Sequence, residues 1–230
     1  MFTIMRIASC LVVVLTFVCL SHAAKTAKED SAKVPFEEDP LYDCYQNASD
    51  AVDIDGKLYV KIQNFDNTTL PPLCDSAERV AKINETHYIF TLAAVIAKFS
   101  NDTLVKFNTS LVLSKTGNHT EFNAMTYRYS SLEGPKLRKL MYMSPERDCM
   151  IFVDNRTATE AAKCQLLQPA QYANDSIPST CLSVYENNCP GKNVTVYYPY
   201  CQTVTTEITL QALLQIMQKM STTTAAPEEC

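Results

Sequence analysis

The sequence predicts a mainly β protein, built as an antiparallel sandwich or a closed barrel. Apolar and polar residues alternate with a period of two in about eight segments, which is typical of strands with one face in water. Short polar links that carry Asn, Asp, Gly or Pro join most of these segments, and no β-α-β alternation is present. Such short connections favour antiparallel neighbours over a parallel sheet.

The first 38 residues are expected to precede the folded domain. Residues 1–23 contain a basic Arg6, an apolar run from Ile7 to Leu20 and a small-residue site ending at Ala23, the three parts of a secretory signal peptide. The apolar run is shorter than the roughly 20 residues that a membrane span needs, so we expect a secreted product with no membrane partner. Residues 24–38 are charged and without apolar periodicity, which predicts a flexible leader.

The barrel or sandwich domain is expected over residues 39–202, beginning with a short helix. Residues 39–55 carry apolar side chains at helical spacing. The period then changes to two in "KLYVKIQNF" (57–65), where Leu58, Val60 and Ile62 alternate with polar residues. This alternation predicts the first strand, with one wet face.

Seven further strands are predicted in the same way. Met125, Tyr127 and Tyr129 share one face of "NAMTYRYS", while Tyr142 and Phe152 belong to "LRKLMYMS" and "MIFVD". Alternation alone does not identify the inner face, because a slip of one residue exchanges the two faces. The predicted strands span 79–96 (with a possible bend near Asn84), 104–113, 121–130, 136–143, 149–154, 160–167 and 194–200.

Two helices are expected after the seventh strand. The segment "PSTCLSVYENNC" (178–189) has the Ser/Thr start of a short helix. Residues 203–220 place apolar side chains at a spacing of three to four, which predicts an amphipathic helix. Packing of this helix on the outside of the domain is favoured over binding a partner. Residues 221–230 have the composition of a flexible tail.

Cysteine and asparagine usage both indicate an extracellular protein. Removal of the signal peptide takes away two of the ten cysteines, and the even set that remains predicts four disulfides. These are Cys44, Cys74, Cys149, Cys164, Cys181, Cys189, Cys201 and Cys230. Nine of the thirteen asparagines begin an Asn-x-Ser/Thr sequon, against roughly two expected by chance, so we expect a glycan-coated surface. The sequons start at Asn47, Asn67, Asn84, Asn101, Asn108, Asn118, Asn155, Asn174 and Asn193.

The sequence contains no motif of an enzyme, a metal site or a cofactor site. The histidines that remain after cleavage, His87 and His119, lack the spacing of zinc ligands. There is no glycine-rich phosphate loop and no nucleophile motif. The formal net charge is −5 without a lysine cluster, so the chain offers no electrostatic attraction for nucleic acid. We expect a monomer without cofactors.

The order of cysteines and strands resembles that of the tick salivary lipocalins, the histamine-binding-protein family. The segments that carry the resemblance are "LCDSAERVAKINETHYIFTL", the pair "RDCMIF" and "KCQLL", "CLSVYENNC" and "VTVYYPYC". The resemblance implies an eight-stranded antiparallel barrel with a short N-terminal helix, C-terminal helices and an interior ligand cavity. By similarity, disulfides would join Cys44 to Cys181, Cys74 to Cys201 and Cys149 to Cys164, leaving Cys189 with Cys230.

The resemblance also bears on the ligand. Amine-binding members carry acidic and aromatic residues beside these cysteines, whereas Met150, Gln165 and Leu167 stand here and the chain has no Trp. A protonated amine needs a buried carboxylate and gains from an aromatic face, so a lipid or amphipathic mediator is favoured over histamine. A Tyr hydroxyl or Arg138 would anchor its head group. The expected lining is Leu58, Val60, Ile62, Met125, Tyr127, Tyr129, Tyr142 and Phe152, side chains that would also serve simply to fill a barrel core.

Two functions remain open at this stage. In the first, a secreted lipocalin sequesters a small inflammatory mediator of the host. In the second, a glycan-shielded scaffold uses surface loops to bind a host immune protein such as a complement component, antibody, cytokine or receptor. An enclosed cavity above roughly 300 Å³ favours the first function, and an apolar surface patch free of glycans favours the second.

Overall fold

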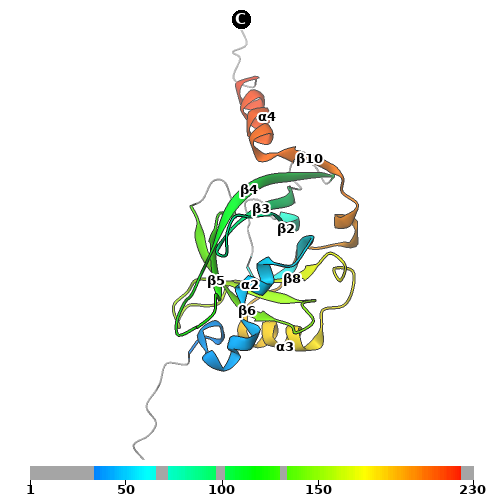
Figure 1. Ribbon diagram of the computed structural model, residues 1–230. Coiled ribbons are helices and arrows are strands. Elements are labelled where there is room, and N and C mark those ends of the chain that lie inside the picture. Colours follow the sequence, from blue (N-terminus) through cyan, green and yellow to red (C-terminus); the bar gives the residue numbers. More distant parts are fainter. Residues whose placement is uncertain (1–33, 66–71, 97–101, 130–133, 224–230) are drawn as a thin grey trace, which may run out of the picture. The chain divides into compact units, whose positions relative to one another are not determined.

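The computed structural model describes residues 34–65, 72–96, 102–129 and 134–223 (Figure 1). Eight antiparallel strands close into a barrel, because β1 to β8 pair in sequence order and β8 also pairs with β1. The prediction of an eight-stranded antiparallel barrel is therefore confirmed. The strands are β1 (Lys57–Gln63), β2 (Pro72–Lys82), β3 (His87–Ile96), β4 (Thr103–Ser114), β5 (Ala124–Tyr127), β6 (Lys136–Met143), β7 (Met150–Asp154) and β8 (Cys164–Pro169).

The strand count was right, but one predicted strand is wrong and another is two strands. The segment 79–96 folds back near Asn84 into a hairpin, with β2 before the turn and β3 after it. The Asn84 side chain accepts the Thr86 backbone N–H at 3.0 Å, a local bond that favours a turn over a continuous strand. The predicted strand 194–200 is reduced to β9 (Val194–Thr195), which pairs with β1, and is followed by the 3-10 helix η3 (Pro199–Gln202).

The predicted N-terminal helix is instead three short turns of helix. They are η1 (Phe36–Glu38), η2 (Pro40–Tyr45) and α2 (Ala48–Val52). Polar side chains interrupt the segment by capping: Asp39 accepts the N–H of Leu41 and Asn47 accepts the N–H of Ser49, each at 3.0 Å. Such caps satisfy backbone donors that a helix start leaves unpaired.

A buried ion pair holds this N-terminal segment to the barrel domain. The Glu37 side chain is fully buried, and Arg156 Nε and Nη2 donate to its two carboxylate oxygens at 2.8 and 3.1 Å. The neighbouring Glu38 pairs with Lys139 of β6. A two-pronged arginine–carboxylate contact fixes geometry as well as charge, so η1 has a defined place on the outer face of the barrel.

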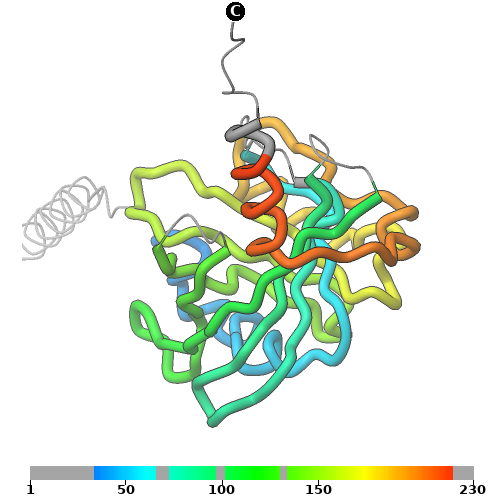
Figure 2. The backbone as a smooth tube through the Cα atoms, turned by 90° about the horizontal axis from the view of Figure 1, so that it is seen from above, coloured from blue at the N-terminus to red at the C-terminus, as the bar shows by residue number. Residues whose placement is uncertain are grey.

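The C-terminal region differs from its prediction at its start. Residues 206–209 form β10 (Thr206–Thr209), which runs parallel to β4, and the helix α4 (Leu210–Thr223) begins only afterwards. β-branched side chains at Thr206, Ile208 and Thr209 favour a strand there over a helix. Figure 2, turned by 90°, shows α4 next to the segment that holds β10.

The helix α3 (Ser179–Asn188) covers the outer face of β6, β7 and β8. Its buried Cys181 and Tyr185 pack against the outward side chains of these strands, which include Ile151, Val153 and Leu166. Two disulfides fasten it there, Cys149–Cys181 and Cys164–Cys189.

These two disulfides correct the pairing that the resemblance implied. In the register of β7 and β8, Cys164 lies opposite Val153, four residues from Cys149. At about 3.3 Å per residue this separates the two cysteines by roughly 13 Å along the hairpin, too far for one bond. Cys149 and Cys164 both point outward to α3 instead.

The other cysteines give a mixed result. The disulfide Cys74–Cys201 is present as implied. Cys44 is exposed and unpaired among the described residues, so its expected bond to Cys181 is wrong because Cys181 is already joined to Cys149. Cys230 lies outside the described residues, as do the predicted signal peptide and the tail from residue 224 on. The expected bond between Cys189 and Cys230 is wrong, since Cys189 bonds Cys164.

Seven of the nine predicted sequons lie in the described parts of the chain, and their asparagines reach the surface. Asn47 is half-buried and the others are exposed. They are Asn84, Asn108, Asn118, Asn155, Asn174 and Asn193. Asn67 and Asn101 lie outside the described residues. Within the described ranges, no helix combines the length and apolar character needed to cross a membrane.

Candidate functional site

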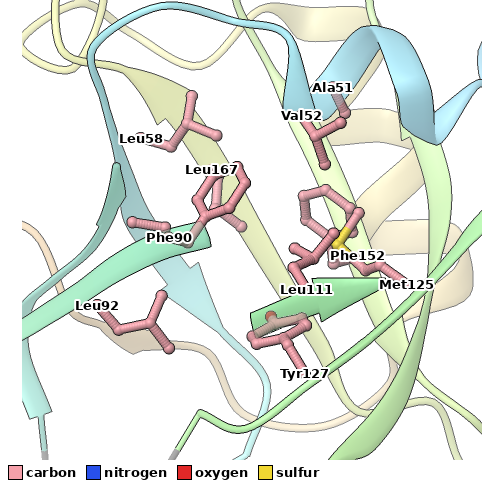
Figure 3. Close-up of a pocket in the computed structure, with 11 residues that line it drawn as sticks. Ala51, Val52, Leu58, Phe90, Leu92, Leu111, Met125, Tyr127, Phe152 and Leu167 are labelled. Carbon is pink, nitrogen blue, oxygen red and sulfur yellow. The ribbon is translucent and has the colours of Figure 1, made fainter. Parts of the chain in front are cut away.

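The candidate site is a cavity inside the barrel with almost wholly apolar walls (Figure 3). Its volume is about 40 Å³. By the same measure one water molecule needs roughly 10–15 Å³, so most of the barrel interior is filled by side chains. The lining residues are Ala51, Val52, Leu58, Ala77, Phe90, Leu92, Leu111, Met125, Tyr127, Phe152 and Leu167.

Four of the eight residues expected to bind ligand line this cavity: Leu58, Met125, Tyr127 and Phe152. Val60 belongs to the same interior core cluster without lining the cavity. These placements follow from the alternation of the strands, which sends every second side chain into the barrel.

Two expected lining residues, Ile62 and Tyr142, face outward. The register of β1 shifts between Val60 and Ile62, and the register of β6 shifts between Leu140 and Tyr142. An extra residue at each bulge exchanges the inner and outer faces beyond it. Ile62 and Tyr142 therefore pack in the cluster under α3, and the prediction that they line the cavity is wrong.

The short helix α2 closes one end of the cavity. Ala51 and Val52 project from it toward Phe152 and Leu111, as Figure 3 shows. The backbone N–H of Ala48 donates to the carbonyl of Phe122 at 2.7 Å, which ties the start of α2 to the segment before β5. The N-terminal helix was predicted, but its part in closing the barrel was not.

A buried polar cluster adjoins the cavity at Tyr127, away from α2. Its centre is Arg138 of β6, with 4% of its surface exposed. Arg138 Nη1 donates to the Tyr127 hydroxyl at 3.1 Å and to Gln165 Oε1 at 2.7 Å, and Nε lies 3.0 Å from Asp154 Oδ1. Tyr129, the remaining expected lining residue, donates its hydroxyl to Asp154 Oδ2 at 3.1 Å. Tyr129 thus belongs to the polar cluster and not to the apolar walls.

The electrostatics of the cluster follow from burial and from the charges inside it. Burial lowers the pKa of Arg138, but Tyr127 and Asp154 outweigh burial and raise it overall, so the guanidinium stays charged. Burial raises the pKa of Tyr129, and the Asp154 carboxylate raises it further. Burial also raises the pKa of Asp75 on β2 to about 6, although Arg138 and a hydrogen bond with Gln165 lower it.

Arg138 is not fully satisfied by its neighbours. Its Nη2 is buried and has no hydrogen-bond acceptor among the residues that the structure describes. A buried donor without an acceptor costs about 1–3 kcal/mol. The cluster therefore offers a hydrogen-bond donor next to an apolar cavity.

Sequence reasoning missed part of the wall and part of the polar cluster. Phe90 and Leu92 stand at alternate positions of "YIFTLAAV", where the same period-two pattern marks them as one face. Asp154 follows Phe152 by two residues and so shares its inward face. Asp75 gave no such signal, because the strand before residue 79 was not predicted.

Comparisons with known proteins agree with this geometry. The family model for the tick histamine binding protein matches residues 36–203. No curated protein matches the chain. Solved structures similar to the chain include the AM182 serotonin complex, with a TM-score of 0.50 and 13% identity over 67% of this chain and 91% of that one.

Two further solved structures are similar to the chain. Insecticyanin from the tobacco hornworm Manduca sexta has a TM-score of 0.50 and 10% identity over 72% of this chain and 90% of that one. Japanin from Rhipicephalus appendiculatus bound to cholesterol has a TM-score of 0.46 and 15% identity over 63% of this chain and 93% of that one.

The closed eight-stranded barrel around an interior cavity defines a lipocalin, a ligand-binding class of protein. The family model covers well over half of the sequence. The chain therefore belongs to the tick histamine-binding protein family.

Proposed function

We propose that this protein is a secreted lipocalin that sequesters a small amphipathic mediator of the host, holding its apolar body inside the barrel. The observation that carries the proposal is the apolar cavity, closed at one end by α2 and adjoined by the Arg138 cluster. Apolar walls with a few convergent polar groups are the usual composition of a small-molecule site.

The polar cluster supports a ligand that carries an oxygen acceptor. Arg138 Nη2 lacks an acceptor within the described structure, and a hydroxyl or carbonyl oxygen would satisfy it. Asp154 already balances the charge of Arg138, and Asp75 adds negative charge when it ionises. A carboxylate ligand would therefore meet two acids and one base, which favours an uncharged oxygen over an anionic head group.

The size of the cavity sets a condition on this function. Its 40 Å³ is well below the roughly 300 Å³ of ordinary ligand pockets. Binding therefore requires side chains to move, and Met125 has the flexible, unbranched side chain suited to this. Leu92 and Tyr127 are only half-buried, so their side chains can also change rotamer and widen the cavity.

The same small volume favours a second function, recognition of a host immune protein by the outside of the barrel. The filled interior would then be a core, and glycans on the exposed sequons would leave selected surfaces accessible. This second function predicts no saturable binding of any small molecule.

The test is native mass spectrometry of the secreted, deglycosylated protein, followed by organic extraction and calorimetric titration with histamine, serotonin, leukotrienes, fatty acids and a sterol. A co-purified or saturably bound amphipathic molecule supports sequestration. Ala77→Phe, which fills the cavity from β2, should weaken that binding at least tenfold.

The matched control is Val80→Phe, on the same strand but 57% exposed, which should leave affinity unchanged. Equal effects of the two variants would contradict binding inside the barrel. If no small molecule binds, the next experiment is a pull-down from plasma. Capture of a plasma protein equally by the parent and by Ala77→Phe would favour protein recognition over sequestration of a small molecule.

A further inference from the structure

The C-terminal helix α4 exposes part of its apolar face. Around a helical turn of 100° per residue, Leu210, Leu213, Leu214 and Met217 fall on one side. Of these only Leu213 is buried, at 5% exposure, while Leu214 and Met217 are 38% and 40% exposed. The contacts of α4 are mainly with β10 and β4. Leu210 is half-buried. The helix therefore lies against the domain by Leu213 and, in part, Leu210, while Leu214 and Met217 remain exposed.

The strand β10, which leads into α4, also has one edge that pairs with no other described strand. In the strand order β10 is the last member and pairs with β4 alone among the described strands. Its other edge therefore presents backbone N–H and C=O groups that another strand can pair with. Figure 1 shows α4 rising on the side of β10 that faces away from β4.

We propose that β10 and α4 form the interface of a symmetric dimer between two copies of this chain. The two copies would pair β10 antiparallel to β10 across a two-fold axis and pack the apolar faces of the two α4 helices together. Two-fold dimers use the same patch on both subunits, so the patch must be compatible with itself.

The chemistry of this patch suits a second copy better than a charged partner. From Leu210 to Lys219, α4 carries a single charged residue, Lys219, at the helix face opposite Met217. Two apolar faces therefore meet without like-charge repulsion. Thr206, Ile208 and Thr209 have high strand propensity, which favours extension of the sheet.

The sequence around the patch leaves it free of N-linked glycans of its own. No asparagine occurs after Asn193, so β10 and α4 contain no sequon. Exposed sequons occur on the barrel strands and loops, for example at Asn84 and Asn155. The nearest exposed one along β4 is at Asn108, two residues beyond Lys106, which pairs with Thr209. An apolar surface without attached glycans is where a protein contact is expected.

The first experiment is sedimentation velocity of the full secreted, glycosylated chain over a concentration series, with Cys44→Ser and Cys230→Ser introduced to prevent adventitious disulfides. We expect a concentration-dependent dimer. The double variant Leu214→Glu/Met217→Glu places acids on the exposed apolar face and should be monomeric at the same concentrations. A monomer at millimolar concentration in the parent protein would overturn the proposal.

The matched control is Gln211→Glu/Gln215→Glu, which adds the same two charges to the polar face of the same helix, where both residues are exposed. It should dimerise like the parent. Because all four substituted residues are exposed, circular dichroism should show unchanged folding. A dimer that survives Leu214→Glu/Met217→Glu would place the interface elsewhere and overturn the proposal.

The strand pairing has its own test. A two-fold axis perpendicular to the sheet places one residue of β10 directly opposite its own copy, with Cβ atoms about 4.5–5.5 Å apart. Single cysteines at each of positions 206–209, in the same Cys44→Ser/Cys230→Ser background with the three disulfides intact, should give an oxidised dimer at that one residue. No crosslink at any of the four positions would overturn the pairing of β10. If the protein is a monomer and instead captures a plasma protein through α4, the partner of this surface is a host protein and the dimer proposal is overturned.

Discussion

Asp75 should make the protein less stable at neutral pH than in mild acid. Its pKa rises from 3.8 to about 6, chiefly because burial penalises the carboxylate. A raised pKa means that the folded protein binds this proton more tightly than the unfolded chain does. The favourable effect of the protonated carboxyl is fully present below pH 3.8 and is lost as the pH rises through 6.

The magnitude follows from the shift in pKa. A shift of about two pKa units at about 1.4 kcal/mol per unit gives a cost on the order of 3 kcal/mol once Asp75 is ionised. Asparagine keeps the shape and the hydrogen-bonding capacity toward Gln165 but carries no charge. Asp75→Asn should therefore be about as stable as the parent at pH 3.5 and more stable by up to about 3 kcal/mol at pH 7.5.

Urea unfolding followed by circular dichroism, with the disulfides intact, at pH 3.5, 5, 6 and 7.5 measures this difference. The control is Glu186→Gln on α3, an exposed acid that should change stability little at any of these pH values. A gain from Asp75→Asn that is the same at pH 3.5 and 7.5, or that grows toward acid, would refute the assignment of a desolvated Asp75.

Three other perturbations test the remaining parts of the architecture. Arg138→Met removes the ion-pair partner of Asp154, whose side chain is 25% exposed. This variant should lower the free energy of unfolding at pH 7.5, measured in urea, by about 2–3 kcal/mol, as for the loss of a hydrogen bond to a charged group. A neutral result would mean that the pair is solvated. Peptide mapping of the non-reduced protein should link Cys149 to Cys181. Replacing both cysteines by Ala should lower the free energy of unfolding by about 4 kcal/mol for a closed loop of this length. A peptide that joins Cys149 to any other cysteine contradicts the placement of α3. Phe90→Ala should lower the free energy of unfolding by about 3–5 kcal/mol and enlarge the cavity, and a loss below 1 kcal/mol in the same assay would argue that Phe90 is not a wall of the core.

The alternation of the strands carried most of the fold prediction. Period two in "KLYVKIQNF" and "NAMTYRYS" is a local property, since successive side chains of any strand point to opposite faces. Alternation therefore assigned Leu58, Met125, Tyr127 and Phe152 to faces of their strands from the sequence, but it did not identify those faces as the interior. A helix was predicted in the segment that contains α2, but its closure of one end of the barrel was not.

The features that the sequence did not predict depend on contacts between residues far apart in sequence. The bulges beyond Val60 and Leu140 turn Ile62 and Tyr142 outward, and bulges arise from pairing with a neighbouring strand, not from the strand's own residues. Asp75 meets Arg138 only because the barrel brings β2 and β6 to a shared interior.

The disulfides also separate what the sequence predicted from what the tertiary structure decided. The sequence by itself indicated that disulfides would form, because an even set of cysteines after an expected signal peptide is typical of an extracellular chain. Three disulfides are present, and Cys44 is unpaired among the described residues. The tertiary structure alone decided that Cys149 and Cys164 bond to α3, since a disulfide forms only where the fold brings two Cβ atoms within about 4.5 Å. Alternation is encoded residue by residue, whereas partners across the barrel are fixed by the register of strands and the docking of helices.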